Sequence, residues 1–371
     1  MLVLRIAAFA IAALTAASTT LSAVHTFVLP RAAQVRLSRA AFLVVRFFIV
    51  RVARLRRTER ATDDTLALFA PLSLLFLPVV WLTVIGASYT VMFWSVNDQG
   101  WRAAINASGS SMFTLGFAHP SGLPATFLAF SEAALGIASL ALLITYLPSM
   151  YAAFARREAQ VALLASRAGR EGRAPWAPTM IIRFHAIGAF DQLDDLWSDW
   201  EAWFVDVEES HLSLAALPFY RSPLPGRSWV TAAGTVLDGV ALMESSVDTP
   251  NSPRAQLCIR AGFLALRRIA DFFNIPYDAD PAPDDETSIT REEFDEALAT
   301  MVDAGVPLKR DRDQAWRDFN GWRVNYDAVL LGLATVTLAP PAPWSSDHRK
   351  PPYRRMPVTR RARARRGNAP Q

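Results

Sequence analysis

The stretch SSMFTLGFAHP, residues 110–120, could bind an ion through its backbone rather than through charged side chains. Gly116 stands between two bulky residues, and glycine adopts dihedral angles that side chains resist. Consecutive backbone carbonyls that face one way can replace the hydration shell of a cation, and the Thr114 hydroxyl would add a ligand at one end. The stretch is therefore a candidate for a site where main-chain oxygens coordinate a cation.

The elements around this stretch are apolar enough to cross a membrane. Of the 371 residues, 52% are hydrophobic and 19% are charged, and the apolar residues are concentrated in the first 157 positions. Residues 6–30, 65–97 and 133–155 contain no Asp, Glu, Lys or Arg, and about 20 apolar residues suffice to span a bilayer. The sequence predicts an integral membrane protein with three spanning helices.

The distribution of arginine predicts the orientation of these helices. Residues 31–60 contain nine Arg and one acid, Glu59, and a second basic stretch follows residue 155. Such flanks stay on the cytoplasmic side. We therefore expect residues 1–30 to form an uncleaved anchor with an outside N-terminus, residues 98–122 to lie outside, and the C-terminal region to be cytoplasmic, as in a bacterial inner (plasma) membrane. The alternative for the first segment is a signal peptide, since Leu21-Ser22-Ala23 loosely resembles a cleavage site.

The basic stretch of residues 31–64 has two interpretations. Arginines interrupt its apolar run, which favours an interfacial helix with long side chains that reach the headgroups. Arg51, Arg54 and Arg57 also recur every third residue, as in a voltage-sensor helix, but no acidic partner helices precede them. The interfacial helix is the simpler prediction.

Residues 98–122 require a special explanation if they enter the membrane. Irregular backbone at membrane depth is tolerated only where it is buried in protein or lines a water-filled path. A short helix over WRAAINASGSSMF, residues 101–113, would direct the negative end of its dipole towards a cation. Symmetry-related copies around an axis would then supply a cage of carbonyl groups.

This arrangement resembles the pore module of the potassium-channel superfamily in its two-helix bacterial form. The resemblance covers about residues 65–160: an outer helix over 65–97, a pore helix and filter over 100–120, and an inner helix over 123–157. It implies a selectivity filter for K⁺ in a homotetramer, with no other cofactor. Transient K⁺ ligands would come from Thr114 and Gly116. The filter implied by the match consists of Thr114, Leu115, Gly116, Phe117 and Ala118.

Other positions also match or depart from the family pattern. Gly136 falls at the hinge glycine of the inner helix, and Pro148 would kink that helix near the gate. Ala118 replaces the second filter glycine, and Ser110 takes the place of a pore-helix carboxylate. Glu132 is an intramembrane carboxylate and thus a functional candidate: it either braces the filter from behind or lies near the outer headgroups.

The region 158–345 predicts a helical cytosolic domain rather than an enzyme. Residues 191–210 and 253–274 have helical apolar spacing, residues 290–293 form a capping box, and residues 309–337 are expected to form one further helix. Nucleotide-binding, zinc and redox motifs are absent from the sequence. Isolated His185 and His211 are expected to be structural, and the tryptophans at 197, 200 and 203 to lie in a core. The acidic residues at 191, 194, 195, 199 and 201 favour a solvated helix face over a Ca²⁺ site.

These observations, with the resemblance, predict an all-α membrane protein that conducts monovalent cations and prefers K⁺. Its cytosolic domain would regulate or assemble the pore. The polybasic tail, residues 346–371, is expected to be disordered and to contact anionic lipid headgroups rather than nucleic acid. The alternative is a non-conducting, membrane-tethered helical sensor or scaffold that retains a pore-like hairpin. Cys258 is the only cysteine, so the chain cannot form an intramolecular disulfide.

Overall fold

The computed structural model describes residues 2–27, 36–56, 58–97, 100–169 and 174–347. These residues are helical and contain no strand; the one β-bridge joins Val247 and Leu308. The prediction of an all-helical protein is therefore confirmed. The end of the expected anchor and nearly all of the polybasic tail lie outside the described residues. The chain divides into two compact units, Met1–Ala155 with His211–Tyr220, and Arg156–Ser210 with Arg221–Gln371.

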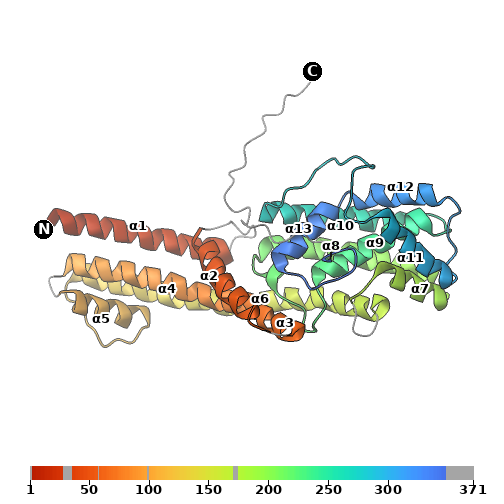
Figure 1. Ribbon diagram of the computed structural model, residues 1–371. Coiled ribbons are helices and arrows are strands. Elements are labelled where there is room, and N and C mark those ends of the chain that lie inside the picture. Colours follow the sequence, from red (N-terminus) through yellow and green to blue (C-terminus); the bar gives the residue numbers. More distant parts are fainter. Residues whose placement is uncertain (1, 28–35, 57, 98–99, 170–173, 348–371) are drawn as a thin grey trace, which may run out of the picture. The chain divides into compact units, whose positions relative to one another are not determined.

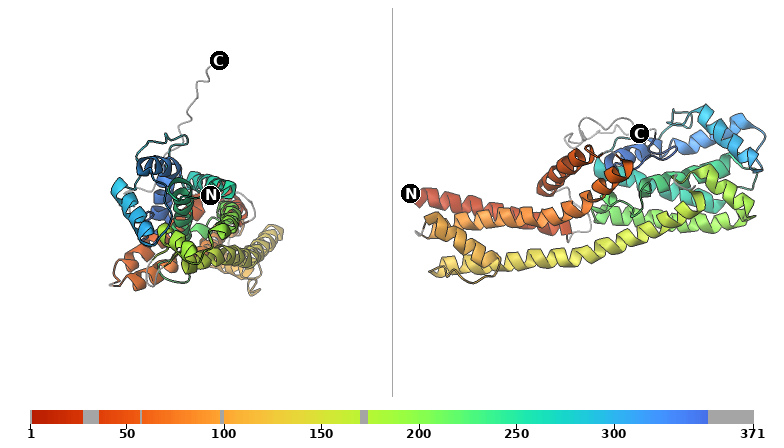
Figure 2. Two further views of the ribbon diagram at one scale, coloured as in Figure 1. Left: turned by 90° about the vertical axis from the view of Figure 1, so that its right-hand side faces the viewer. Right: turned by 60° about the horizontal axis from the view of Figure 1, so that its bottom comes forward.

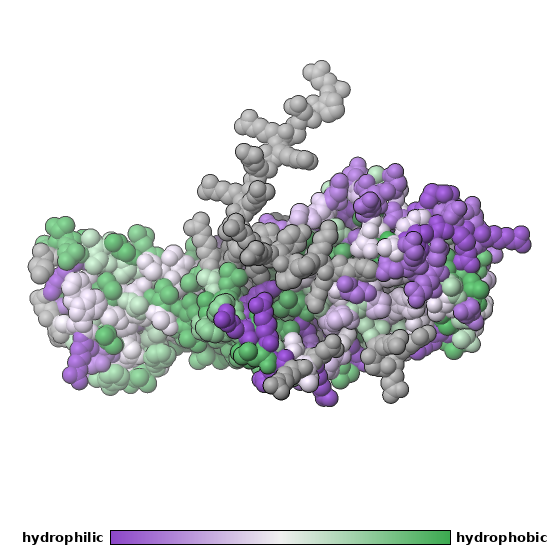
Figure 3. Space-filling model, viewed as in Figure 1, coloured by the Kyte–Doolittle hydropathy of each residue, from purple (hydrophilic) through white to green (hydrophobic). Residues whose placement is uncertain are grey.

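The first unit contains the apolar helices (Figure 1). Three helices are long and apolar enough to cross a membrane, within Leu2–Thr26, Arg60–Val96 and Leu123–Ala168. They correspond to the three predicted spans, and hydrophobic side chains cover much of their surface (Figure 3). The helices of this unit are α1 (Leu2–Phe27), α2 (Arg36–Ala53), α3 (Glu59–Ala67), α4 (Phe69–Val96), α5 (Gly100–Met112) and the first part of α6 (Leu123–Ala168).

Helix α1 packs along α4 in the opposite direction (Figures 1 and 2). The N-terminal end of α1 and the α5 hairpin consequently lie at the same end of this unit. Small residues of α1, including Ala12 and Ala16, are buried with Tyr89 and Met92 of α4. Close packing through small residues is typical of helices that associate in lipid.

The second unit is built around helix α9 (Trp229–Ser246), whose residues are all buried. Since it is buried on every side, α9 is the core helix of this unit. The helices α7, α10, α12 and α13 pack against it. The remaining helices of this unit are α7 (Ala177–Ala186), α8 (Leu193–Ser213, of which the last residues belong to the first unit), α10 (Pro253–Phe273), α11 (Arg291–Asp303), α12 (Arg312–Arg323) and α13 (Asp327–Thr337).

Several sequence predictions for this unit are confirmed, and one is wrong. Helices α8 and α10 occupy the two predicted amphipathic segments, and Thr290 with Glu293 forms the capping box of α11. The single helix expected over residues 309–337 is instead two helices, α12 and α13. The amide of Asn325 donates to the carbonyl oxygens of Gly321 (3.0 Å) and Trp322 (3.4 Å). This side chain satisfies the last carbonyls of α12, so the helix ends there.

A buried ionic network connects the core helices of the second unit. The guanidinium of Arg323 is fully buried and contacts Asp238 at 2.5 Å and Asp327 at 2.8 Å. It also donates to the carbonyl oxygen of Trp344 at 2.6 Å, and the Tyr326 hydroxyl donates to Asp238 at 2.8 Å. Burial raises the pKa of Asp238, while the two carboxylates raise the pKa of Arg323. The network therefore depends on every charge keeping its partner.

Candidate functional site

Helix α5 is held between α4 and the start of α6 by its buried face. Ala104, Ala107, Ser108 and Met112 lie on that face and are buried. At the other end, the indole of Trp101 stacks on Trp94 of α4, with ring centroids 4.9 Å apart. The helix thus has a fixed C-terminal end at Met112, immediately before the Thr-Leu-Gly-Phe stretch.

The backbone after α5 reverses its handedness at alternate residues. Thr114 has φ 53° and Gly116 has φ 72°, while the φ angles of Leu115, Phe117 and Ala118 are negative. The sign of φ therefore changes from residue to residue between Thr114 and Phe117. A left-handed threonine is uncommon because its Cβ is branched. The contacts described next hold this geometry.

Ser110 fixes the stretch with both its main chain and its side chain. The carbonyl oxygen of Ser110 accepts a hydrogen bond from the backbone N–H of Leu115 at 2.8 Å. The Ser110 hydroxyl accepts one from the backbone N–H of Ala118 at 3.0 Å. Ser110 itself is 2% exposed. The residue that the sequence assigns to filter support therefore contacts both ends of the segment 115–118.

The side chains of this segment are exposed in a single chain. Phe113, Leu115 and Phe117 are 59%, 63% and 60% exposed. Exposed aromatic and aliphatic groups of this size mark an interaction surface when they cluster. These three side chains therefore form an exposed apolar surface around the segment.

Glu132 lies behind α5 rather than at the segment itself. Its side chain is fully buried, and its Oε1 lies 2.6 Å from the hydroxyl oxygen of Ser108. The same hydroxyl oxygen lies 3.1 Å from the backbone carbonyl oxygen of Gly86 in α4. Ser108 therefore connects three helices, and Glu132 contacts Ser108 and not Ser110.

At Gly136, the backbone of α6 comes close to the end of α5. An ideal Cβ at this position would lie 2.2 Å from the carbonyl oxygen of Met112. Only glycine allows the two backbones to come this near. Helix α6 passes through both Gly136 and Pro148 without interruption, and the proposed hinge and gate roles of these residues stay predictions.

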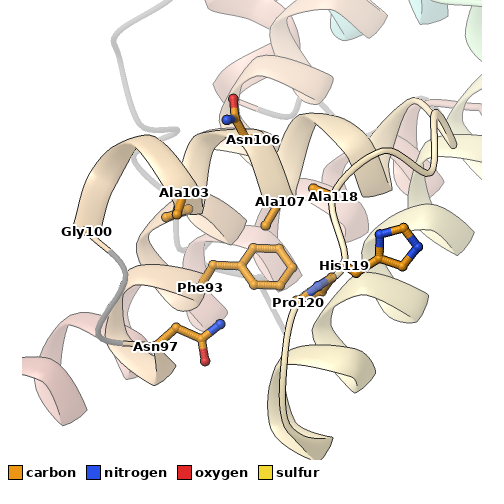
Figure 4. Close-up of a pocket in the computed structure, with 10 residues that line it drawn as sticks. Phe93, Asn97, Gly100, Ala103, Asn106, Ala107, Ala118, His119 and Pro120 are labelled. Atoms are coloured by element: carbon orange, nitrogen blue, oxygen red, sulfur yellow. The ribbon is translucent and has the colours of Figure 1, made fainter.

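A cavity of about 190 Å³ lies beside the segment, between α4 and α5. The ring of Phe93 points from α4 into the space beside Ala107 and the outer end of the segment (Figure 4). Ala118, His119 and Pro120 form its opposite wall. Asn97 and Asn106 also line this cavity.

Sequence reasoning missed Ser108, Met112 and Gly86. The available signal was periodicity: Ala104, Ser108 and Met112 follow at intervals of four and share one helix face. A single hydroxyl on an otherwise apolar, buried face is a candidate for an interhelical hydrogen bond. The partner on α6 could not be identified from spacing, because residues from different helices have no fixed register.

The other candidate residues from the sequence are engaged in packing, hydrogen bonds or ion pairs. Trp197, Trp200 and Trp203 belong to the core of the second unit, as predicted. On the acidic face of α8, Asp194 accepts a hydrogen bond from Ser252, and Asp195 pairs with Arg254. Within the described parts of the chain, no three metal-ligating side chains form a cluster. His211 is fully buried, and the ring of His185 lies 5.4 Å from that of Phe190.

The repeated arginines that suggested a voltage sensor do not all lie on one helix. Helix α2 ends at Ala53, and Arg54 lies in the turn that follows. Arg57 lies outside the described residues. Arg46 and Arg51 are on the helix, with the guanidinium of Arg51 5.7 Å from the ring of Phe47. An arginine above an aromatic ring is compatible with the interfacial interpretation.

The fold and the apolar helices define the class: this is an all-helical, membrane-associated protein with three helices able to span a bilayer. Comparison with protein-family models, curated proteins and solved structures finds no match. The backbone at residues 114–118 is the feature of this class member that points to a function.

Proposed function

We propose that this chain forms a homotetrameric channel for monovalent cations, with K⁺ as the preferred ion. Residues 114–118 would form the selectivity filter, and the pore module would extend over residues 65–157. The observation that carries the proposal is the alternating backbone of Thr114 and Gly116 directly after the C-terminal end of α5.

Main-chain oxygens are suited to this role because they coordinate a dehydrated monovalent cation without a fixed negative charge. In the proposed filter, the positive φ angles of Thr114 and Gly116 would let the carbonyls of this stretch face one way, as a cation cage requires. The C-terminal end of α5, with its partial negative charge, adds a favourable field at the entrance to the row. Ser110 holds the row through its bonds to Leu115 and Ala118.

One copy of the chain supplies one row of carbonyls, so a cage requires several copies around an axis. The exposure of Leu115 and Phe117 supports such an assembly, because neighbouring copies would cover these side chains. On α6, large side chains such as Phe127, Phe130 and Ile137 are likewise 60–70% exposed. These faces suit contact with lipid and with other copies.

Ala118 weakens the outer end of the proposed filter. It has a negative φ, unlike Gly116, and the left-handed conformation would cost an alanine about 1–2 kcal/mol. Its carbonyl would therefore point away from the row. With fewer coordinating carbonyls, K⁺ would be preferred over Na⁺ less strongly than in channels with both glycines.

The orientation follows the arginine asymmetry. The N-terminus and the α5 hairpin would lie outside, and residues 31–64 and the second unit would lie in the cytoplasm of a bacterial cell. The N-terminal end of α1 and the α5 hairpin lie at the same end of the first unit, which supports placing both on the same side of the membrane. The second unit would regulate or assemble the pore and catalyse no reaction, and anionic lipid would be the partner of the tail.

The test is a K⁺ flux assay with the purified full-length chain in liposomes, using two glycine variants. Gly116 and Gly122 both have left-handed backbones, with φ 72° and 89°, and an added Cβ would meet no atom within 3.8 Å at either position. Alanine at either site therefore introduces similar strain. Gly116→Ala is expected to abolish flux, while Gly122→Ala retains it.

Two outcomes would contradict the proposal. Equal flux in both variants would show that residues 114–118 do not conduct. Absence of flux in the wild type and in Ala118→Gly, with both proteins assembled, would favour the non-conducting scaffold.

A further inference from the structure

The hydroxyl of Ser108 has one proton but lies close to two oxygen atoms that would both need a donor if Glu132 were ionised. Its hydroxyl oxygen lies 3.1 Å from the carbonyl oxygen of Gly86 and 2.6 Å from Oε1 of Glu132. A serine hydroxyl has one proton and can donate one hydrogen bond. A carbonyl and an ionised carboxylate are both acceptors only. With Glu132 ionised, Ser108 could satisfy one of the two contacts and would leave the other as an acceptor facing an acceptor.

A protonated Glu132 resolves both contacts. Its carboxyl O–H donates to the Ser108 oxygen, and the Ser108 O–H then donates to the carbonyl oxygen of Gly86. The 2.6 Å separation is normal for a hydrogen bond between two hydroxyl-type groups. Each proton lies between one donor and one acceptor, and the chain of bonds crosses from α6 through α5 to α4.

The second carboxyl oxygen of Glu132 points to the same state. Oε2 is buried and has no hydrogen-bond partner among the described residues. An ionised carboxylate with a bare oxygen in an apolar setting is very costly, whereas the carbonyl oxygen of a neutral acid is much less so. Glu132 makes no salt bridge with any described cation.

The titratable groups on the surrounding elements do not compensate a charge on Glu132. The Tyr89 hydroxyl donates to Ser131, and the guanidinium of Arg5 lies over the Trp94 ring. Arg102 is exposed at the other end of α5. The titratable or charged residues on the facing parts of α1, α4, α5, the loop after α5 and the membrane part of α6 are Arg5, His25, Tyr89, Arg102, His119, Tyr146 and Tyr151.

We infer that Glu132 is held as a neutral carboxylic acid and is a positioning residue, which fastens α6 to α5 and α4 through Ser108. Ser108 is two residues before Ser110, the residue that bonds to the segment 115–118. Ionisation of Glu132 removes the donor to Ser108 and places an uncompensated charge behind α5. The helix is then held less firmly, and so is the backbone after it.

The protonation state can be measured without any reference to conduction. Infrared spectra of the full-length protein in liposomes, recorded at pH 7 for wild type and Glu132→Gln, are subtracted from each other. In the difference spectrum we expect the carbonyl band of a protonated carboxylic acid from the wild type. An exposed glutamate would have lost its proton at this pH, since its pKa is about 4.3. In Ser108→Ala that band is retained but shifted, because the acid loses its acceptor. A carboxylate band in place of the acid band at pH 7 would overturn the inference.

The effect on conduction depends on the proposed channel function and has its own readout. Glu132→Gln supplies an N–H donor to Ser108 without a charge, whereas Glu132→Ala removes the contact. We expect K⁺ flux to be lost in Glu132→Ala and rescued in Glu132→Gln, and wild-type flux to fall at alkaline pH while Glu132→Gln flux does not. Loss of flux in Glu132→Gln equal to that in Glu132→Ala, with both variants assembled, would mean that the negative charge is required and would refute the inference. If wild type carries no flux while the infrared band is present, the channel proposal fails and the neutral acid stands.

Discussion

The contact between Gly136 and the end of α5 gives the sharpest single-residue test of the structure. In Gly136→Ala, the new Cβ would lie 2.2 Å from the Met112 carbonyl oxygen and 3.2 Å from the carbonyl carbon. Non-bonded contacts of a Cβ atom shorter than 3.0 Å are essentially never observed. The obstacle is backbone, so no side-chain rotation relieves it, and α5 and α6 must move apart.

The size of the effect follows from two opposing terms. Overpacking of a buried contact costs about 1–3 kcal/mol, and more where the backbone must shift. Replacing glycine by alanine inside a helix gains about 1 kcal/mol. Gly109→Ala in α5 is a matched control, because its new Cβ would meet nothing within 4 Å. The control therefore receives the helix-propensity gain alone.

We expect Gly136→Ala to be less stable than Gly109→Ala by the full overpacking cost, about 1–3 kcal/mol. Thermal unfolding in one detergent, followed by circular dichroism, measures the difference. In liposomes, K⁺ flux should fall in Gly136→Ala, because Met112 immediately precedes the segment that would bind the ion. If the two variants melt at the same temperature, α5 and α6 are not in contact at Gly136, and the reasoning is wrong.

Three further predictions concern other parts of the chain. Arg323→Met should destabilise the second unit by about 3–5 kcal/mol, because Asp238 and Asp327 lose their buried cation. Since burial raises the pKa of Asp238, folding of this variant takes up a proton, so its thermal-unfolding deficit should shrink as pH falls. Cys258 is fully buried and its thiol pKa is raised by burial, so a maleimide should label it only after unfolding, as mass spectrometry can check. Ala118→Gly should increase the preference for K⁺ over Na⁺ in reversal-potential measurements, and an unchanged ratio would mean that residue 118 does not face the ion.

The helices that could be predicted from the sequence are those with a strong local signal. The three apolar helices were predictable because long stretches without charge have few alternatives in a membrane protein. Helices α8 and α10 were predictable because their apolar spacing has a helical period. The boundary between α12 and α13 was not, since it depends on the Asn325 side chain turning back onto α12.

Sequence reasoning selected residues 114–118 but did not find the contacts that hold them. Thr114 and Gly116 were selected from their spacing and from the resemblance to a channel filter, whereas the left-handed backbone at Thr114 could not be predicted, because threonine rarely adopts it. Glu132 was predicted to brace the filter or to lie near the headgroups, and the structure gives it a buried contact with Ser108. Which residue of one helix meets which residue of another depends on rotation and packing, and a sequence pattern contains neither.

The contacts around α5 explain how a segment with so few bonds of its own can keep an uncommon backbone. Leu115 and Ala118 are bonded through Ser110, which is part of the last turn of α5. The same helix is held at Ser108 by Glu132 and Gly86, and at Met112 by the close approach of Gly136. These three positions lie within five residues of each other, and two of them, Ser108 and Met112, contact α6. We therefore expect a displacement of α6 to reach residues 114–118 through α5, and glycine is required at position 136 as long as the two backbones stay this close.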